Sequence, residues 1–191
     1  MDRPKLYSPE RTVNAQDARK VRHAVSHEPA TLPMPARPPK LEWLDVRNIV
    51  DEVCADLHRE LAATQIETTI DVPSPLGAVA DRAMIRQAVT NLVRNALEAM
   101  PRGGRLEITS YCGPRGLELE VADSGPGLSD DALSRAFEPF YTTKRDAAGL
   151  GLAQVRHVAQ AHGGDVLAMN CPEGGAAFTL RLPARAHASA A

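Results

Sequence analysis

The sequence has few aromatic residues, few cysteines, little net charge and no long apolar run. Aromatic residues are only 4% of the 191 residues, so a surface that stacks nucleic-acid bases is not expected. The three cysteines are widely spaced and odd in number, which argues against a disulfide framework or a metal cluster and favours a reducing, cytoplasmic setting. The formal charge of −2 gives no electrostatic reason to expect nucleic acid or membrane as a partner. No apolar run approaches the roughly 18 residues of a membrane span, and the first residues do not form a secretory signal.

The remaining composition is that of a globular protein, with 43% hydrophobic and 24% charged residues. The length predicts one sizeable domain with an appendage. Residues 1–40 hold seven of the fifteen prolines, no glycine, and eight basic against four acidic residues. We therefore interpret 1–40 as a proline-rich linker or arm, 41–183 as the domain and 184–191 as a tail.

The spacing of apolar residues along the domain alternates between that of helices and that of strands. Apolar residues three and four positions apart predict helices at 45–63, 81–100, 129–136 and 151–162, with Asp81 as the cap of the second. Alternating segments predict strands at 66–72, 78–80, 105–111, 117–122, 165–169 and 176–182. The last four strands form two hairpins, so the sheet is mixed and mostly antiparallel. The expected fold is an α/β two-layer sandwich with about three helices on one face of that sheet.

The helix at 81–100 has a polar stripe between its apolar face and its solvated side. On a helical projection the stripe holds Gln87, Asn91, Asn95 and Glu98. One interpretation is that these residues are boundary polar groups. The other is that their side-chain oxygens meet a cation and its phosphate ligands, since magnesium needs only one or two protein oxygens when phosphates supply the rest.

Two glycine-rich loops also allow two interpretations each. A strand is followed by Asp123-Ser-Gly125-Pro-Gly127. This loop is either a simple turn, or a binding loop in which the Asp123 carboxylate accepts a hydrogen bond from an exocyclic amine and the glycines let the backbone approach a purine. Gly149-Leu150-Gly151-Leu152 opens a helix, where it either ends a loop or presents backbone N–H groups to an anion. Between them, Phe137-Glu-Pro-Phe140-Tyr-Thr-Thr-Lys144 either anchors a long loop on the core or adds hydroxyls and a lysine to a site.

The order of these motifs is more specific than any one of them. The two asparagines, the Asp-x-Gly-x-Gly loop, the Phe-Glu-Pro-Phe segment, the Gly-Leu-Gly-Leu loop and Gly174-Gly175 before a last strand follow one another over about 41–183. This succession closely resembles the catalytic and ATP-binding domain of two-component sensor histidine kinases, in the GHKL ATPase superfamily. The Phe-Glu-Pro-Phe segment and the Gly-Leu-Gly-Leu loop are more similar to histidine kinases than to gyrases, chaperones or mismatch-repair ATPases.

The resemblance implies ATP as ligand, Mg²⁺ as cofactor and a role for each motif. It implies that Asn95 ligates magnesium, Asn91 contacts phosphates, and Asp123 accepts from the adenine amine. It implies that Gly125 and Gly127 shape the adenine pocket, that Phe137 and Phe140 anchor a lid, and that Gly149, Leu150, Gly151 and Leu152 form the phosphate loop. The polar stretch 141–148 is then expected to be mobile without nucleotide, with Lys144 either closing on phosphates or remaining a solvated charge.

The sequence departs from the family pattern at three places. Ala147-Ala148-Gly149 replaces the usual Gly-Thr-Gly, and Ala176-Ala177 replaces a usual threonine. The helical hairpin that carries the phospho-accepting histidine is missing, and the segment around His27 is only faintly similar to it.

We therefore expect a module, monomeric in isolation, that transfers the γ-phosphate to a histidine of a separate or missing acceptor domain, with a response regulator as further partner. The alternatives are a serine kinase of the anti-sigma-factor type and a non-enzymatic nucleotide-binding or docking module.

Overall fold

A computed structural model describes residues 37–144 and 147–184 of the chain. Most of the predicted arm, including His27, lies outside the described residues, as does all of the predicted tail after residue 184. In chain order the elements are β1 (Glu42–Asp45), α1 (Val46–Asp56), α2 (His58–Ala63), β2 (Ile66–Asp71), β3 (Gly77–Ala80), α3 (Arg82–Ala99), β4 (Gly104–Gly113), β5 (Gly116–Asp123), α4 (Asp130–Arg135), α5 (Gly151–Ala161), β6 (Asp165–Asn170) and β7 (Ala176–Pro183).

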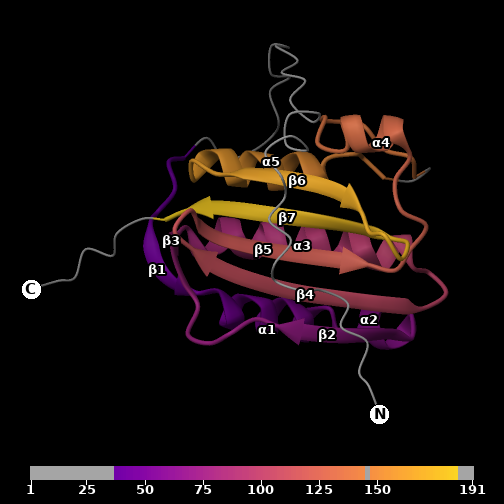
Figure 1. Ribbon diagram of the computed structural model, residues 1–191, viewed down its shortest axis with the longest axis horizontal. Helices are drawn as coiled ribbons and strands as arrows, with labels where there is room; N and C mark the ends of the chain where they lie inside the picture. The colour runs from indigo at the N-terminus through magenta and orange to yellow at the C-terminus, as the bar shows by residue number, and fades with distance from the viewer. Residues whose placement is uncertain (1–36, 145–146, 185–191) are drawn as a thin grey trace, which may run out of the picture. The chain divides into compact units, whose positions relative to one another are not determined.

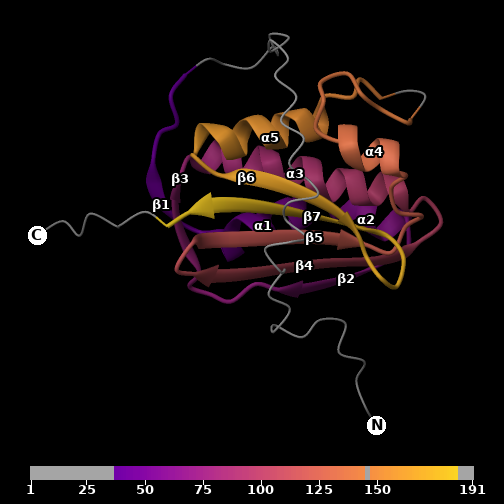
Figure 2. The same cartoon turned by 45° about the horizontal axis from the view of Figure 1, so that its top comes forward.

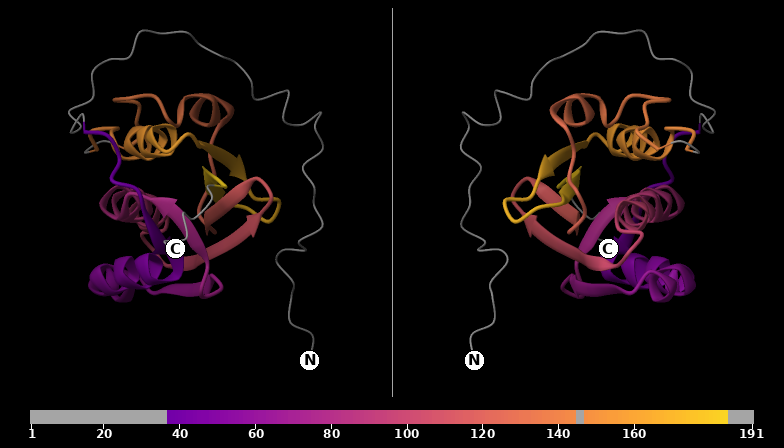
Figure 3. Two further views of the ribbon diagram at one scale, coloured as in Figure 1. Left: turned by 90° about the vertical axis from the view of Figure 1, so that its left-hand side faces the viewer. Right: turned by 90° about the vertical axis from the view of Figure 1, so that its right-hand side faces the viewer.

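Five strands form one sheet in the order β2-β4-β5-β7-β6. Only β2 and β4 are parallel, and all other neighbours in this sheet are antiparallel. The three longer helices α1, α3 and α5 lie together on one face of the sheet (Figures 1 and 3), while α4 lies near one end of α5 (Figure 2). The predicted α/β two-layer sandwich is thus confirmed. No helix within the described ranges is long and apolar enough to span a membrane.

Both predicted hairpins are present. The alternation of apolar and polar residues along their strands explains which face is buried. In the β4–β5 hairpin, Leu106, Ile108, Leu119 and Val121 are buried against the helices, while the residues between them are less buried. Successive side chains of a strand point to opposite faces, so one alternating pattern produces one apolar face. The β6–β7 hairpin closes the sheet at its other edge.

Helix α3 forms where the apolar spacing predicts it. Asp81 caps its N-terminus by accepting a hydrogen bond from the backbone N–H of Met84. Its apolar face is completely buried, with Ile85, Val89 and Leu92 at 1%, 0% and 0% exposure. Burial of that face leaves the polar stripe at the side of the helix, where it can face a ligand.

Two features of the N-terminal part differ from the predictions. The single helix expected at 45–63 is interrupted at Leu57, whose φ of −91° and ψ of 7° are not helical, so that α1 and α2 are separate. Leu57 is nevertheless 98% buried, so the interruption preserves the apolar face. Strand β1 was not predicted, because four residues carry little local pattern and its partner β3 lies some thirty residues later in the chain.

Asp81 also connects three parts of the domain. Its Oδ2 accepts from the backbone N–H of Lys40 at 2.8 Å and from the Arg37 guanidinium at 2.7 Å. Its own N–H donates to Nε2 of His162, just after α5, at 2.9 Å. The hydrogen bond from Arg37 holds the pKa of Asp81 well below its usual range, despite opposing burial. The segment entering β1, the start of α3 and the end of α5 therefore meet at one residue.

The role of Asp81 predicts the order of stability of two substitutions. Asp81→Ala removes the cap and is expected to lower the free energy of unfolding by about 1–2 kcal/mol or more. Asp81→Asn keeps a good cap and loses only the charge, so it should be less destabilising. Because the depressed pKa contributes stability that is lost as pH falls below the unfolded value of about 4, the parent should lose stability more steeply there than Asp81→Asn. Urea denaturation between pH 3 and 7 measures both effects, and equal pH dependence would contradict the assignment.

Candidate functional site

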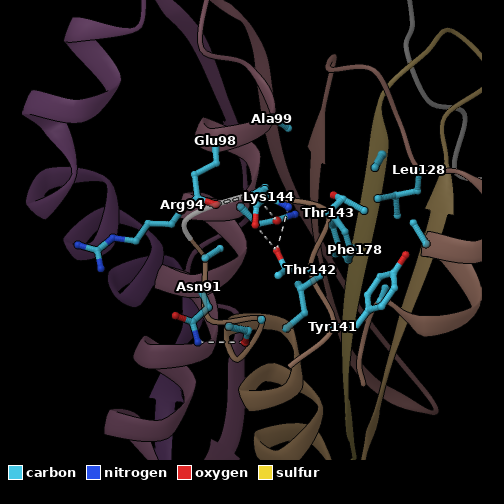
Figure 4. A pocket seen from close by; sticks show the side chains of 18 of the residues that line it. Asn91, Arg94, Glu98, Ala99, Leu128, Tyr141, Thr142, Thr143, Lys144 and Phe178 are labelled. Atoms are coloured by element: carbon cyan, nitrogen blue, oxygen red, sulfur yellow. Dashed lines mark hydrogen bonds and ion pairs between the residues drawn. The ribbon is translucent and has the colours of Figure 1, made fainter. Parts of the chain in front are cut away.

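A cavity of about 500 Å³ opens between α3, the loop after β5 and the start of α5. Of the twelve residues to which the resemblance assigns a role, nine line it, namely Asn91, Asn95, Asp123, Gly127, Lys144, Gly149, Leu150, Gly151 and Leu152. Gly125, Phe137 and Phe140 do not. Figure 4 shows Asn91 and Lys144 among the lining side chains. Motifs from three separate segments are thus brought to one cavity by the fold.

One wall of the cavity is the polar stripe of α3. The side-chain Nδ2 of Asn91 donates to Oε1 of Gln154 at 2.9 Å and to the Gly151 carbonyl at 3.2 Å, which ties α3 to the first turn of α5. Farther along, Asn95 Oδ1 and Glu98 Oε2 both accept from the ammonium of Lys144, at 3.0 and 2.5 Å. The stripe therefore offers two hard oxygen atoms that already hold a cation.

A buried carboxylate lies at the other end, where β5 stops. Asp123 is 5% exposed, and its Oδ1 accepts from the backbone N–H groups of Gly125 at 2.8 Å and Ala176 at 3.3 Å. Among the described residues no hydrogen bond reaches its Oδ2, which leaves that oxygen for a ligand. Burial raises the pKa of Asp123, and the two backbone hydrogen bonds partly oppose the rise. A desolvated acceptor of this kind makes strong hydrogen bonds with a matching donor.

Glycines allow the backbone to close around Asp123. Gly175 has a φ of +89°, and a Cβ there would lie 1.8 Å from the carbonyl oxygen of Asp123. Gly125 lies against the carboxylate itself, where a Cβ would be 2.8 Å from Oδ1. Gly127, with a φ of +74°, is close to Asn170, whose side-chain amide binds both the N–H and the carbonyl of Leu128 at 2.8 Å. Asn170 was missed by the sequence analysis, because a lone asparagine at a strand end carries no pattern.

The two phenylalanines behave differently. The ring of Phe137 makes an edge contact with Phe178, at 6.2 Å between centroids, and packs against the core. Phe140, in contrast, is 61% exposed. Its backbone N–H donates to the Gly149 carbonyl at 2.9 Å, which ties this segment to the loop before α5.

Tyr141, which was not assigned a role, also lines the cavity. Its hydroxyl donates to Asp131 at 3.0 Å, and the Arg135 guanidinium lies 4.3 Å from its ring centroid. Its position directly after the Phe-Glu-Pro-Phe segment was the sequence feature that could have indicated a place in the cavity. The predicted mobile stretch 141–148 includes residues 145–146, which lie outside the described residues.

Residues 80–186 match a known family, the histidine kinase-, DNA gyrase B- and HSP90-like ATPases. The chain belongs to this family. Its similar proteins are sensor histidine kinases, and the domain is an ATP-binding domain of that type.

Among them, sensor protein FixL of Bradyrhizobium diazoefficiens is 40% identical over 123 residues, which cover 63% of this chain and 24% of FixL. The chain spans between 24% and 40% of the length of the curated relatives compared.

Solved structures agree with this placement. The catalytic domain of histidine kinase ThkA superposes with a TM-score of 0.69 at 28% identity, covering 75% of this chain and 95% of that domain. The ATP-binding domain of PrrB from Mycobacterium tuberculosis gives a TM-score of 0.60 at 30% identity, covering 76% of this chain and 98% of that domain. The fold is therefore that of a histidine kinase catalytic domain.

The two adjacent glycines before β7 offer a matched pair of substitutions. Gly174→Ala and Gly175→Ala both place a side chain at positive φ, which costs on the order of 1–3 kcal/mol. Nothing lies within 4 Å of a Cβ at Gly174, whereas a Cβ at Gly175 collides with the backbone of Asp123. We expect Gly175→Ala to be clearly the less stable in urea denaturation. Equal losses would mean that the backbone at Asp123 gives way freely.

Proposed function

We propose that the chain binds ATP with Mg²⁺ in this cavity and transfers the γ-phosphate to a histidine of an acceptor domain. The observation that carries the proposal is the presence of two complementary ends in one cavity. A buried carboxylate with an unused oxygen lies at Asp123, and a pair of cation-holding oxygens lies at Asn95 and Glu98. These ends suit the exocyclic amine of adenine and the metal-bound phosphates respectively.

Adenine recognition is assigned to Asp123 and the glycines around it. The carboxylate oxygen Oδ2 accepts from the adenine amine, and the backbone at Gly127 lines the same cavity. Guanine presents a carbonyl where adenine presents an amine, so the same carboxylate disfavours it. This arrangement makes the site selective for ATP over GTP.

Phosphate binding is assigned to the first turn of α5. The N-cap position Leu150 makes no side-chain cap, so the first backbone N–H groups of α5 are available to an anion. Gly149, with a φ of +67°, turns the chain into the helix, and Gly151 leaves its cavity side open. Lys144 lines the same cavity and carries a positive charge.

The residues present fit magnesium. The Lys144 ammonium acts as a stand-in cation on Asn95 Oδ1 and Glu98 Oε2, and oxygen atoms are the ligands that magnesium prefers. Asn95 would hold the metal, and Asn91 lies one turn away to contact the phosphates. When bound, the metal neutralises charge on the phosphate oxygens and thereby favours phosphoryl transfer.

Transfer itself requires mainly positioning. A nitrogen of the acceptor imidazole forms a bond to the γ-phosphorus while the bond to the bridging oxygen breaks, and ADP leaves. The residues of this chain keep adenine at Asp123 and the phosphates at the start of α5, so that the γ-phosphate is held for the incoming imidazole. A response regulator is the proposed next partner, and the proposed setting is the cytoplasm.

Binding should respond differently at the two ends. Asp123→Ala is expected to weaken ATP by about 1–3 kcal/mol, which corresponds to about 5- to 150-fold, and to remove the preference over GTP. Asn95→Ala should mainly reduce the gain in affinity that magnesium gives. Isothermal titration calorimetry with and without magnesium measures both. If both variants bind like the parent, the site assignment is wrong.

The raised pKa of Asp123 adds a pH dependence to ATP binding. Since the ionised form accepts the hydrogen bond, ATP affinity should fall on acidification at a higher pH than an ordinary aspartate would give. Asp123→Asn cannot titrate and should show a flat profile over the same range. A profile in the variant that matches the parent would assign the titration to another group.

The transfer step predicts activity only with an added acceptor. The chain alone should label itself negligibly with radioactive ATP, because no described histidine is held opposite the proposed phosphate position. Addition of a histidine-bearing helical hairpin from a related kinase should give labelling that acid removes, as phosphohistidine requires. Acid-stable labelling would indicate a serine kinase instead. Rapid labelling of the chain alone that His27→Gln abolishes would contradict the need for an added acceptor.

A further inference from the structure

The ammonium of Lys144 lies where the proposed metal would lie. Its Nζ is 3.0 Å from Asn95 Oδ1 and 2.5 Å from Glu98 Oε2, and Figure 4 shows it reaching from its loop to α3. Asn95 and Glu98 are three residues apart on one helix, so their side chains share a face. The chain thus places its own cation on both oxygens at once.

The surrounding charges leave the neutralisation of Glu98 to Lys144. Arg94 also lines the cavity, but its guanidinium pairs with Glu60 at 3.7 Å. Burial raises the pKa of Asp123, and the charge of Lys144 is among the effects that oppose the rise. If Lys144 left without replacement, the carboxylate of Glu98 would face an incoming polyphosphate without a neutralising cation. Like charges repel each other, so a polyphosphate would approach such a carboxylate less readily than it approaches a neutralised one.

We propose that Glu98 is a positioning residue that holds Lys144 on Asn95 in the empty site, so that Lys144 and a divalent metal are alternative cations at one pair of oxygens. The inference rests on the proposed function, because the incoming metal arrives with the nucleotide. Metal-bound nucleotide displaces the ammonium, which is then free to pair with phosphate oxygens.

The same arrangement explains why binding should depend on metal. Metal-free ATP would draw Lys144 towards its phosphates and leave Glu98 unpaired beside them. With magnesium, the metal takes the place of the ammonium and no carboxylate is left unpaired. The side chains of Lys144 and Glu98 are 34% and 55% exposed, and a partly exposed ion pair is weak enough to exchange. Glu98 therefore sets the metal dependence of the affinity.

The first test uses Mn²⁺ alone, without nucleotide, on the full chain. Electron paramagnetic resonance of free Mn²⁺ gives the affinity directly. Lys144→Met removes the competing ammonium and should tighten Mn²⁺ binding by about tenfold or more. The double variant Lys144→Met/Glu98→Gln should return to the weak binding of the parent. If Lys144→Met binds Mn²⁺ no more tightly than the parent, the proposal is overturned.

Arg94→Met is the matched control for this test. It removes a cation from the same cavity wall, but one whose charge is directed to Glu60 rather than to Asn95. The Mn²⁺ affinity of this variant should stay within about twofold of the parent. An equal gain in Arg94→Met and Lys144→Met would show that general cavity charge, and not the contact with Glu98, controls the metal.

The second test measures ATP affinity with magnesium and with a chelator. Glu98→Gln should reduce the ratio of the two affinities by about tenfold, chiefly by tightening metal-free ATP. Glu67→Gln removes a carboxylate from β2, away from the cavity, and should leave the ratio unchanged. An unchanged ratio in Glu98→Gln would contradict the proposal. Failure of the parent to bind ATP at all would instead refute the proposed function, while the Mn²⁺ experiment would still decide the role of Glu98.

Discussion

The packing of α3 against the sheet fixes the rotation of that helix about its axis, and the cavity depends on this rotation. Ile85, Val89 and Leu92 are buried, and an α-helix advances by about 100° per residue. A helix held by such a face cannot turn without exposing several apolar side chains, each of which contributes about 1.5–3 kcal/mol when buried. The direction of Asn91 and Asn95 is therefore determined by residues that do not line the cavity.

The cavity combines groups that are unfavourable in an ordinary protein interior. Asp123 is desolvated, and Glu98 and Lys144 form an ion pair that contributes little to stability because both are partly exposed. The two lining glycines at positive φ, Gly127 and Gly149, add conformational freedom to the unfolded chain. Their destabilising effect is offset by the apolar core on the other side of α3, where Ile85, Val89 and Leu92 are buried.

Much of this arrangement followed from local sequence, and what did not has a common cause. The apolar spacing of 81–100 predicted both the burial of Leu92 and the lateral position of Asn95, because one helical period determines both. The alternation in β4 and β5 likewise predicted a hairpin. In contrast, no local pattern reveals strand β1, the two hydrogen bonds of the Asn170 side chain or the ion pair of Lys144. Each of these depends on a partner far away in the chain. Phe140 shows the same limit, since the hydrogen bond from its backbone N–H to the Gly149 carbonyl does not follow from the type of its side chain.

The contacts that define the cavity also determine when it can exist. The bond from Ala176 to Asp123 spans 53 residues, and the bond from Asn91 to Gln154 spans 63. Contacts between such distant residues form late in folding, because closing long loops is entropically unfavourable. A partly folded chain therefore has no complete nucleotide cavity. A nucleotide that binds only the complete cavity adds its binding free energy to the native state alone, so its concentration in the cell would govern how long the domain survives against unfolding and proteolysis.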